Sequence, residues 1–242
     1  MTAIGQYILF IIKLFKNREK FSVYVGLVFT EAMNLGINSI VIVTIVSTFI
    51  GAVTCIQTAA NLVSPFIPDY IIALVVRDMT ILELSPTIIS IVLAGKVGSH
   101  IAGELGTMKI TEQVDALEVM GINSVSYLVL PKVIAALVTF PMLVIISAFL
   151  SLLGGYVAGV LTQVITPEEY IRGLQADFIE FNVIFAIIKA LVFSFLISTV
   201  SAFKGYNTSG GALEVGKSST AAVTSSCIAI LCADYLLAQL LL

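Results

Sequence analysis

Long apolar runs separated by short polar stretches make up most of the chain. An α-helix needs about 20 apolar residues to cross a bilayer, and five segments reach that length. These predicted spans cover residues 37–60, 79–104, 128–162, 182–203 and 218–241. Apolar residues at helical spacing between positions 4 and 15 predict a further helix that lies on the membrane surface, with an ordinary packed helix as the alternative.

Composition agrees with this pattern and excludes several other classes of protein. Of the 242 residues, 59% are hydrophobic and 11% are charged, whereas soluble domains are about a quarter charged. The net charge of -3 gives no broad basic surface for nucleic acid, and one histidine and three cysteines show no metal-ligand or disulfide spacing. We therefore expect an all-α integral membrane protein without metal or cofactor. Residues 1–30 would form the surface helix and an elbow, and residues 31–242 a five-helix transmembrane core.

Positive residues in the short loops predict the orientation of the chain. Loops on the cytoplasmic side of a membrane carry an excess of lysine and arginine. The positive residues that fall on one side are Lys13, Lys16, Arg18, Lys20, Lys109, Lys204 and Lys217. We expect this side to be cytoplasmic, with the N-terminus inside and the C-terminus outside. Asp69, Arg77 and Asp78 would then lie in a loop on the outer side. An odd number of spans without an internal repeat also predicts that a second copy completes the pathway.

Three ionisable residues fall inside predicted spans, where charge is costly and commonly functional. Glu83, Lys189 and Asp234 lie at similar predicted depths in the outer half of the bilayer. They form either a structural ion-pair network or the polar lining of a site for an amphipathic cargo. Pro86 is expected to kink the second span beside Glu83 and to open backbone groups there.

The cytoplasmic part of the second span combines charged and small residues. Lys96, His100 and Glu104 share one helical face, and snorkelling with local pairing explains them adequately. Small residues recur every four positions beside them, as Ala94, Gly98, Ala102 and Gly95, Ser99, Gly103. Such rows let helices approach closely, so we expect this span at the centre of the bundle.

Residues 211–218, GALEVGKS, match the nucleotide-binding pattern GxxxxGK[ST]. A true P-loop joins a buried strand to a helix within a parallel sheet. Here the motif joins two spans, and no sheet-forming run is present in the sequence. We interpret the match as accidental.

The most polar stretch inside the core is ELGTMKITEQVDALEVMG, residues 104–121. Thr111 is the expected N-cap of a short cytoplasmic helix that Gly121 ends, and Glu112, Asp115 and Glu118 form an acidic stripe. Helices that bind anionic lipid usually carry a basic face. The stripe therefore indicates a protein partner, and the alternative is a solvated helix without one.

Four segments of this sequence resemble the MlaE/YrbE permease family. They are LELSP at residues 82–86, AGKVG at 94–98, the polar stretch at 104–121, and the region from Gly205-Tyr206 to GKSST at 216–220. The resemblance implies a single permease domain over residues 1–242, as a subunit of an MCE-type ABC phospholipid transporter in the inner membrane of a bacterium. The expected partners are a second copy, a cytoplasmic ATPase dimer, a periplasmic hexamer of MCE-domain proteins and a small cytoplasmic STAS-type subunit.

The resemblance also assigns roles to residues. It implies a phospholipid pocket that includes Glu83, Lys189 and Asp234. The polar helix becomes the coupling helix that seats in the ATPase, with Lys109, Thr111, Glu112, Gln113, Asp115 and Glu118 as its polar residues. Leu82 and Ser85 stand where the family commonly has arginine and glycine, so a headgroup contact by that arginine is absent or relocated.

Two functions from different classes remain after the resemblance is considered. The first is a transport subunit that is not itself an enzyme and is driven by ATP hydrolysed in another chain. The alternative is a self-contained secondary transporter or channel that uses Glu83, Lys189 and Asp234 as an ion relay. An intramembrane enzyme lacks a recognisable nucleophile and base in this sequence.

Overall fold

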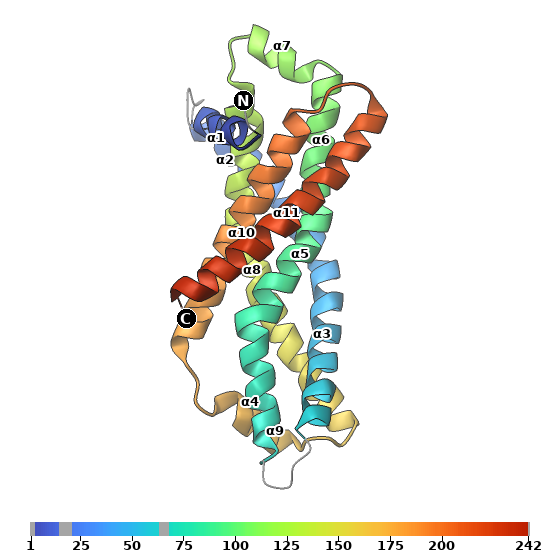
Figure 1. Cartoon of the computed structure of the whole chain (residues 1–242), viewed down its shortest axis with the longest axis vertical. Coiled ribbons are helices and arrows are strands. Elements are labelled where there is room, and N and C mark those ends of the chain that lie inside the picture. The colour runs from blue at the N-terminus through green and yellow to red at the C-terminus, as the bar shows by residue number, and fades with distance from the viewer. Residues whose placement is uncertain (1–2, 15–20, 63–67, 242) are drawn as a thin grey trace.

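Five long apolar helices run through the described part of the molecule and confirm the predicted all-α membrane fold (Figure 1). The computed structural model describes residues 3–14, 21–62 and 68–241. The five helices cover Val23–Asn61, Tyr70–Ile110, Ser124–Leu161, Glu180–Tyr206 and Ala212–Leu241. Each corresponds to one of the predicted spans, although the first two are much longer than expected.

The first two long helices change helix type along their length. The first consists of α2 (Phe21–Leu35), η1 (Ile37–Ser39) and α3 (Ile40–Asn61). The second consists of α4 (Tyr70–Met79), η2 (Thr80–Ile88), α5 (Ile89–Leu93), η3 (Ala94–Gly98) and α6 (Ser99–Ile110). Both η2 and η3 are π-helical segments. Such wide turns are rare and are frequently found at functional sites, so η2 is a candidate position for one.

Short helices lie at the two ends of the bundle (Figure 1). At one end, α7 (Gln113–Val119) joins α6 to α8 (Ser124–Leu161), and α1 (Ala3–Leu14) lies nearby. At the other end, α9 (Pro167–Gln175) packs against α4 and leads into α10 (Glu180–Tyr206). The last helix, α11 (Ala212–Leu241), crosses the bundle obliquely (Figure 1). We call the two ends the α7 end and the α9 end.

Small residues allow the closest helix crossings, as the sequence predicted for the second span. A Cβ atom on Gly205 of α10 would lie 2.6 Å from the Ala102 carbonyl oxygen of α6. A Cβ atom on Gly154 of α8 would lie 2.2 Å from the Thr48 carbonyl oxygen of α3. In both crossings one backbone rests on the other, which only glycine permits. The second span therefore packs against α10, while α8 packs against α3.

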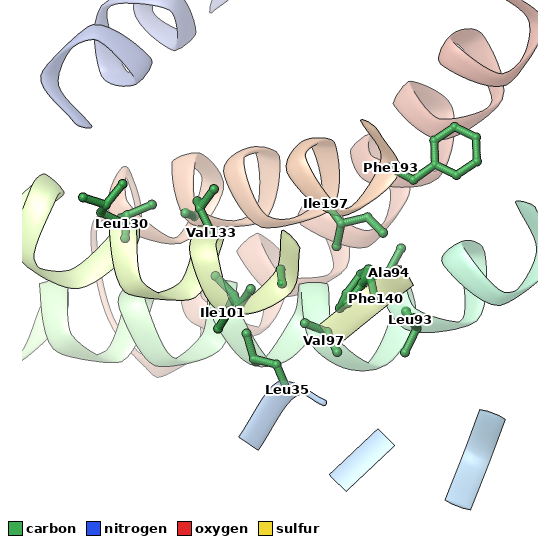
Figure 2. Packing of buried hydrophobic residues seen from close by; sticks show 14 of the residues in the cluster. Leu35, Leu93, Ala94, Val97, Ile101, Leu130, Val133, Phe140, Phe193 and Ile197 are labelled. Atoms are coloured by element: carbon green, nitrogen blue, oxygen red, sulfur yellow. The ribbon is translucent and has the colours of Figure 1, made fainter. Parts of the chain in front are cut away.

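Apolar side chains from four of the long helices fill the interior between these crossings. Leu35, Val97, Ile101, Phe140 and Ile197 are at most 2% exposed. Figure 2 shows these side chains converging from α2, η3, α6, α8 and α10. The second span is therefore in the middle of the bundle, and polar groups that it carries are surrounded by protein on several sides.

Arg77 is buried at the α9 end, where the sequence had predicted a loop containing Arg77 and Asp78. Both residues are helical in α4, and Arg77 is 2% exposed. Its guanidinium donates to carbonyl oxygens at the end of α9, at 3.0 Å from Leu174 and 2.5 Å from Ala176. Asp78 neutralises it at 2.9 Å. The prediction failed because this charge satisfies the free carbonyls of a helix terminus rather than facing water.

The N-terminal helix α1 packs along one face and exposes another. Phe10 and Leu14 are buried, and the Tyr7 hydroxyl lies 2.7 Å from Thr199 Oγ1 of α10. The apolar side chains that remain exposed are Ile8, Leu9 and Ile12. One face of α1 is thus packed, as in the alternative of an ordinary packed helix. That the other face lies on the membrane surface stays a prediction. Lys16, Arg18 and Lys20, used for the orientation, lie outside the described residues.

Candidate functional site

The structure brings together the three ionisable residues singled out inside the spans. Lys189 Nζ of α10 lies 2.8 Å from Glu83 Oε1 of η2 and 2.7 Å from Asp234 Oδ1 of α11. Thr87 Oγ1 is 3.3 Å from Glu83 Oε2 and 3.2 Å from Asp234 Oδ1, so its hydroxyl joins the two carboxylates. The Phe185 ring centroid lies 4.8 Å from the Lys189 ammonium. Three spans therefore meet at one charged centre, which we call the Lys189 site.

Pro86 explains the local backbone at this site. Proline has no N–H, so the carbonyl of Leu82, four residues earlier, loses its ordinary α-helical donor. The chain forms the π-helical segment η2 around Pro86, and Lys189 Nζ donates to the Leu82 oxygen at 3.0 Å. The expectation that Pro86 opens backbone groups beside Glu83 is met by this carbonyl. Lys189 is consequently held by two carboxylates and one carbonyl.

The depth of Glu83 differs from the sequence estimate. The sequence placed it about one turn into the second span, whereas the helix already begins at Tyr70. Glu83 is therefore about 20 Å along that helix, at a rise of roughly 1.5 Å per residue. Lys189 is about 14 Å from the start of α10 by the same measure. The charges lie well inside the apolar helices rather than at their ends.

The three charged side chains differ strongly in exposure. Lys189 is fully buried, Asp234 is 18% exposed and Glu83 is 47% exposed. One ammonium and two carboxylates leave a net charge of about −1 if all are ionised. A carboxylate facing hydrocarbon is costly, so the exposed side of Glu83 is expected to face a cavity, another protein chain or a polar ligand.

A second buried charge cluster lies nearer the α7 end and was missed by the sequence reasoning. Lys132 Nζ of α8 lies 2.6 Å from Glu31 Oε1 of α2 and 2.7 Å from Glu104 Oε2 of α6. Lys132 is 2% exposed, Glu31 16% and Glu104 33%. Neither Glu31 nor Lys132 stood out in the sequence, because Glu31 precedes the first predicted span and Lys132 lies near the start of the third. The continuous first helix and the long α8 place both inside the bundle.

Replacing Lys132 with methionine is expected to destabilise the folded chain. The substitution keeps the side-chain volume but leaves two carboxylates without their countercharge, which typically costs about 3–5 kcal/mol when the group is buried. The partial exposure of Glu104 favours the lower end of this range. Thermal unfolding in detergent measures the effect.

The matched control is Lys217→Met, which breaks the exposed pair with Glu214, where Lys217 is 64% exposed. Exposed pairs contribute less than about 1 kcal/mol, so this midpoint should barely move. Equal midpoints for both variants would contradict a structural role for Lys132.

Of Lys96, His100 and Glu104, only the last two make the local pair that the sequence suggested, among the interactions of the described residues. The Lys96 ammonium donates to the Asn38 carbonyl oxygen, and His100 Nδ1 lies 3.8 Å from Glu104 Oε2. Glu104 also binds Lys132, so it belongs to the buried cluster. Lys96 of η3 therefore connects the second span to the first helix, and Glu104 of α6 connects it to α8.

The short helix α7 differs from its prediction at its start and agrees at its end. Thr111 is not an N-cap, because its hydroxyl donates back to the Thr107 oxygen of α6 at 2.8 Å. Glu112 is the N-cap instead, with φ 61° and without a side-chain capping bond. Gly121 ends the helix as expected, with φ 81° and its backbone nitrogen 3.0 Å from the backbone carbonyl oxygen of Glu118. The Thr111 signal was misleading because α6 itself continues almost to that residue.

Two of the predicted partner-facing acids are bound within the chain. Asp115 Oδ1 lies 2.6 Å from Lys109 Nζ. Glu118 Oε1 accepts hydrogen bonds from Ser124 Oγ at 2.8 Å and from the Tyr206 hydroxyl at 2.9 Å. Glu112 and Gln113 are exposed and have no such contact among the described interactions. The acidic stripe thus fixes α7 to the bundle as well as facing outward.

The outermost side chains at the tip of α7 are apolar. Val119 is 89% exposed and Met120 is 65% exposed. Leu213, at the start of α11, is 74% exposed. Two consecutive, strongly exposed apolar side chains thus stand at the end of this short polar helix. The sequence missed this feature because a seven-residue helix gives little periodicity to read.

The GALEVGKS segment does not have the shape of a P-loop. Helix α11 begins at Ala212 and continues through Ser218 without a preceding strand. Lys217 Nζ lies 2.7 Å from Glu214 Oε1, so the lysine pairs with a neighbouring carboxylate. The segment therefore lacks the strand and the glycine-rich loop that precede the helix of a P-loop and wrap the phosphates.

Five apolar helices with a charged centre held between three of them define a multi-pass membrane protein with a polar site inside its spans. Comparison with known proteins gives the family. The family model "Permease MlaE" matches residues 28–240, so the chain belongs to the MlaE permease family. This finding confirms the resemblance seen in the sequence.

Curated relatives extend over nearly the whole chain. A probable ABC transporter permease protein of Rickettsia bellii is 36% identical over 238 residues, which cover 98% of this chain and 92% of that protein. A probable ABC transporter permease protein of Synechocystis sp. is 35% identical over 212 residues, covering 87% of this chain and 80% of that protein. These names indicate a permease subunit of the ABC transporter class.

A third relative comes from a plant. The chloroplastic protein TRIGALACTOSYLDIACYLGLYCEROL 1 of Arabidopsis thaliana is 40% identical over 162 residues. The match covers 65% of this chain and 45% of that protein. Its name contains that of a glycolipid.

Proposed function

We propose that this chain is the permease subunit of an ABC transporter that moves phospholipid. The observation that carries the proposal is the half-exposed Glu83 carboxylate, held at membrane depth by the buried Lys189. A polar group in that position suits a molecule with one charged end and apolar chains. The lipid name of the plant relative supports the same substrate class.

The expected assembly has parts on both sides of the membrane. A second copy would cover the exposed side of Glu83, and the site would then lie between the two copies. A separate ATPase dimer would hold the tip of α7, so the α7 end is cytoplasmic. An MCE-domain hexamer would receive lipid at the α9 end, on the periplasmic side of a bacterial inner membrane. A small STAS-type subunit is the remaining expected partner.

Charge at the Lys189 site favours one kind of headgroup. Because Lys189 is fully enclosed, the first charge that a ligand meets is the Glu83 carboxylate. Leu82, which stands where the family commonly has arginine, contributes no positive charge. A headgroup with an ammonium, such as ethanolamine, therefore fits better than an anionic glycerol headgroup.

Reconstitution into vesicles tests this function. The chain, its ATPase and labelled phospholipid are placed in proteoliposomes, and transfer to acceptor vesicles is followed with and without ATP. We expect transfer only with ATP and ATPase, and at least severalfold faster transfer of the ethanolamine lipid than of the glycerol lipid, because one desolvated charge contact contributes about 1–3 kcal/mol.

Two outcomes would contradict different parts of the proposal. Transfer of lipid or ions by the chain alone, under a gradient and without ATPase, would favour a self-contained transporter that uses the Lys189 site as an ion relay. Equal transfer of the two headgroups would remove the charge preference and leave the transport function intact.

A further inference from the structure

The residues that hold α7 also hold the end of α10, the helix that carries Lys189. Tyr206 is the last residue of α10, Ser124 is the first residue of α8, and Glu118 belongs to α7. The Tyr206 hydroxyl lies 2.9 Å from Ser124 Oγ, and both donate to Glu118 Oε1. The ends of three helices are thus joined by one carboxylate and two hydroxyls. We call these three residues the Glu118 joint.

The Tyr206 ring gives the joint two more neighbours. Its centroid lies 5.6 Å from the Phe10 ring of α1 and 5.9 Å from Lys109 Nζ of α6. Lys109 in turn pairs with Asp115 of α7. Tyr206 therefore contacts residues of α1, α6, α7 and α8. A displacement of α7 relative to the bundle would act on Tyr206.

Helix α10 connects the joint to the Lys189 site without interruption. Lys189 and Tyr206 belong to the same helix, Glu180–Tyr206, which contains no proline. They are separated by about 26 Å at a rise of roughly 1.5 Å per residue. At its last residue the helix is held by Glu118, and further along, well inside the helix, Lys189 is held by Glu83 and Asp234. A shift or rotation at one end is carried to the other because a continuous helix is stiff over this length.

We propose that Glu118 and Tyr206 are positioning residues that couple movement of α7 to the Lys189 site through α10. This inference rests on the proposed function, since it assumes that an ATPase moves α7. Nucleotide-driven movement of the docked α7 pulls or releases Tyr206 through the Glu118 carboxylate. The resulting displacement of α10 changes how tightly Lys189 holds Glu83, and with it the exposure of that carboxylate to lipid.

The test compares ATP hydrolysis with lipid transfer in the reconstituted complex. Tyr206→Phe removes only the hydroxyl and keeps the ring contacts with Phe10 and Lys109. We expect ATPase co-purification and ATP hydrolysis to stay within about twofold of wild type, while lipid transferred per ATP falls about tenfold, the size expected for losing one hydrogen bond to a carboxylate. A merely structural contact would change both rates together or neither.

Three further variants make the result specific. Tyr7→Phe is the matched control, because it removes the hydroxyl next to Thr199 on the same helix α10, outside the joint. It should leave the ratio of transfer to hydrolysis unchanged. Glu118→Leu should lower that ratio as Tyr206→Phe does, and Glu118→Gln should keep most of it, because an amide oxygen still accepts both hydrogen bonds.

Several results would overturn the inference. One is an unchanged ratio of transfer to hydrolysis in both Tyr206→Phe and Glu118→Leu. Another is an equal fall of hydrolysis and transfer, or loss of the ATPase from the complex, because either would show that the joint only supports docking. A wild-type complex that moves no lipid with ATP would instead contradict the proposed function itself.

Discussion

Replacing Lys189 with methionine is expected to abolish ATP-driven lipid transfer and to lower the stability of the folded chain. The fully buried ammonium is the shared partner of Glu83 and Asp234. Without it, two carboxylates remain inside the bundle, and leaving buried charge unpaired costs about 3–5 kcal/mol. Glu83 is 47% exposed, so solvent or ligand reduces its share of this cost. Thermal unfolding and the vesicle transfer assay measure the two effects.

A triple variant separates stability from transport. Lys189→Met combined with Glu83→Gln and Asp234→Asn removes all three charges, so no unpaired charge is left inside the bundle. We expect its unfolding midpoint to return towards that of wild type, because neutral replacements of a buried ion group are often tolerated. Lipid transfer should stay at background. Normal transfer by the triple variant would show that the three charges form a structural network and nothing more.

Placing aspartate at both Val119 and Met120 is expected to remove the ATPase from the purified complex. These side chains are the most exposed apolar groups of the α7 tip, and a charge in the centre of a docking surface would be desolvated on binding. Truncating or charging such a central residue commonly costs about 2 kcal/mol or more per site, so two changes should lower affinity by several hundredfold or more. Co-purification of the ATPase measures this loss.

The matched control is Leu161→Asp at the opposite end of the bundle. Leu161 is 77% exposed at the end of α8, so it tests whether an added charge on an exposed apolar residue disturbs the chain in general. Retention of the ATPase by Leu161→Asp and its loss from the α7 variant would locate the docking surface. Retention by both variants would contradict it.

The same structure changes the reason for an effect expected from the sequence. From the sequence, Asp115 and Glu118 were expected to face the ATPase as polar residues of the coupling helix, so that their substitution would weaken binding directly. Both residues are paired inside the chain, with Lys109 and with Ser124 and Tyr206. Their substitution is now expected to act by displacing α7, and we expect Val119 and Met120 to make the direct contacts with the ATPase.

Apolar run length and the cost of buried charge predicted the features that depend on the membrane. Five spans follow from helix length, and the shared depth of Glu83, Lys189 and Asp234 follows from their places within those spans. The ion pairs of Lys189 with Glu83 and Asp234 agree with this shared depth. Their role as a lipid pocket stays a proposal, as do the ATPase-contacting role of α7 and the division of the chain into a surface segment and a core.

Features that depend on contacts between distant helices could not be predicted from the sequence. Glu31 precedes the first predicted span and Lys132 lies near the start of the third, so nothing in the sequence indicated that Lys132 pairs with both Glu31 and Glu104 inside the bundle. Arg77 was expected in a loop because nothing in the local sequence shows that α9 ends over it. The orientation of a short helix such as α7 likewise depends on residues far along the chain.

Site-specific photocrosslinking tests the central claim, that lipid occupies the Lys189 site during transport. A photoreactive residue replaces Met79, which is 51% exposed and one turn before Glu83, and the control position is Phe149 on α8, which is 63% exposed. With radiolabelled phospholipid, crosslinking at position 79 should change when ATP is added and should fall in the Lys189→Met background. Crosslinking at position 149 reports surrounding membrane lipid and should respond to neither. If the two positions behave alike, the Lys189 site does not hold the transported lipid.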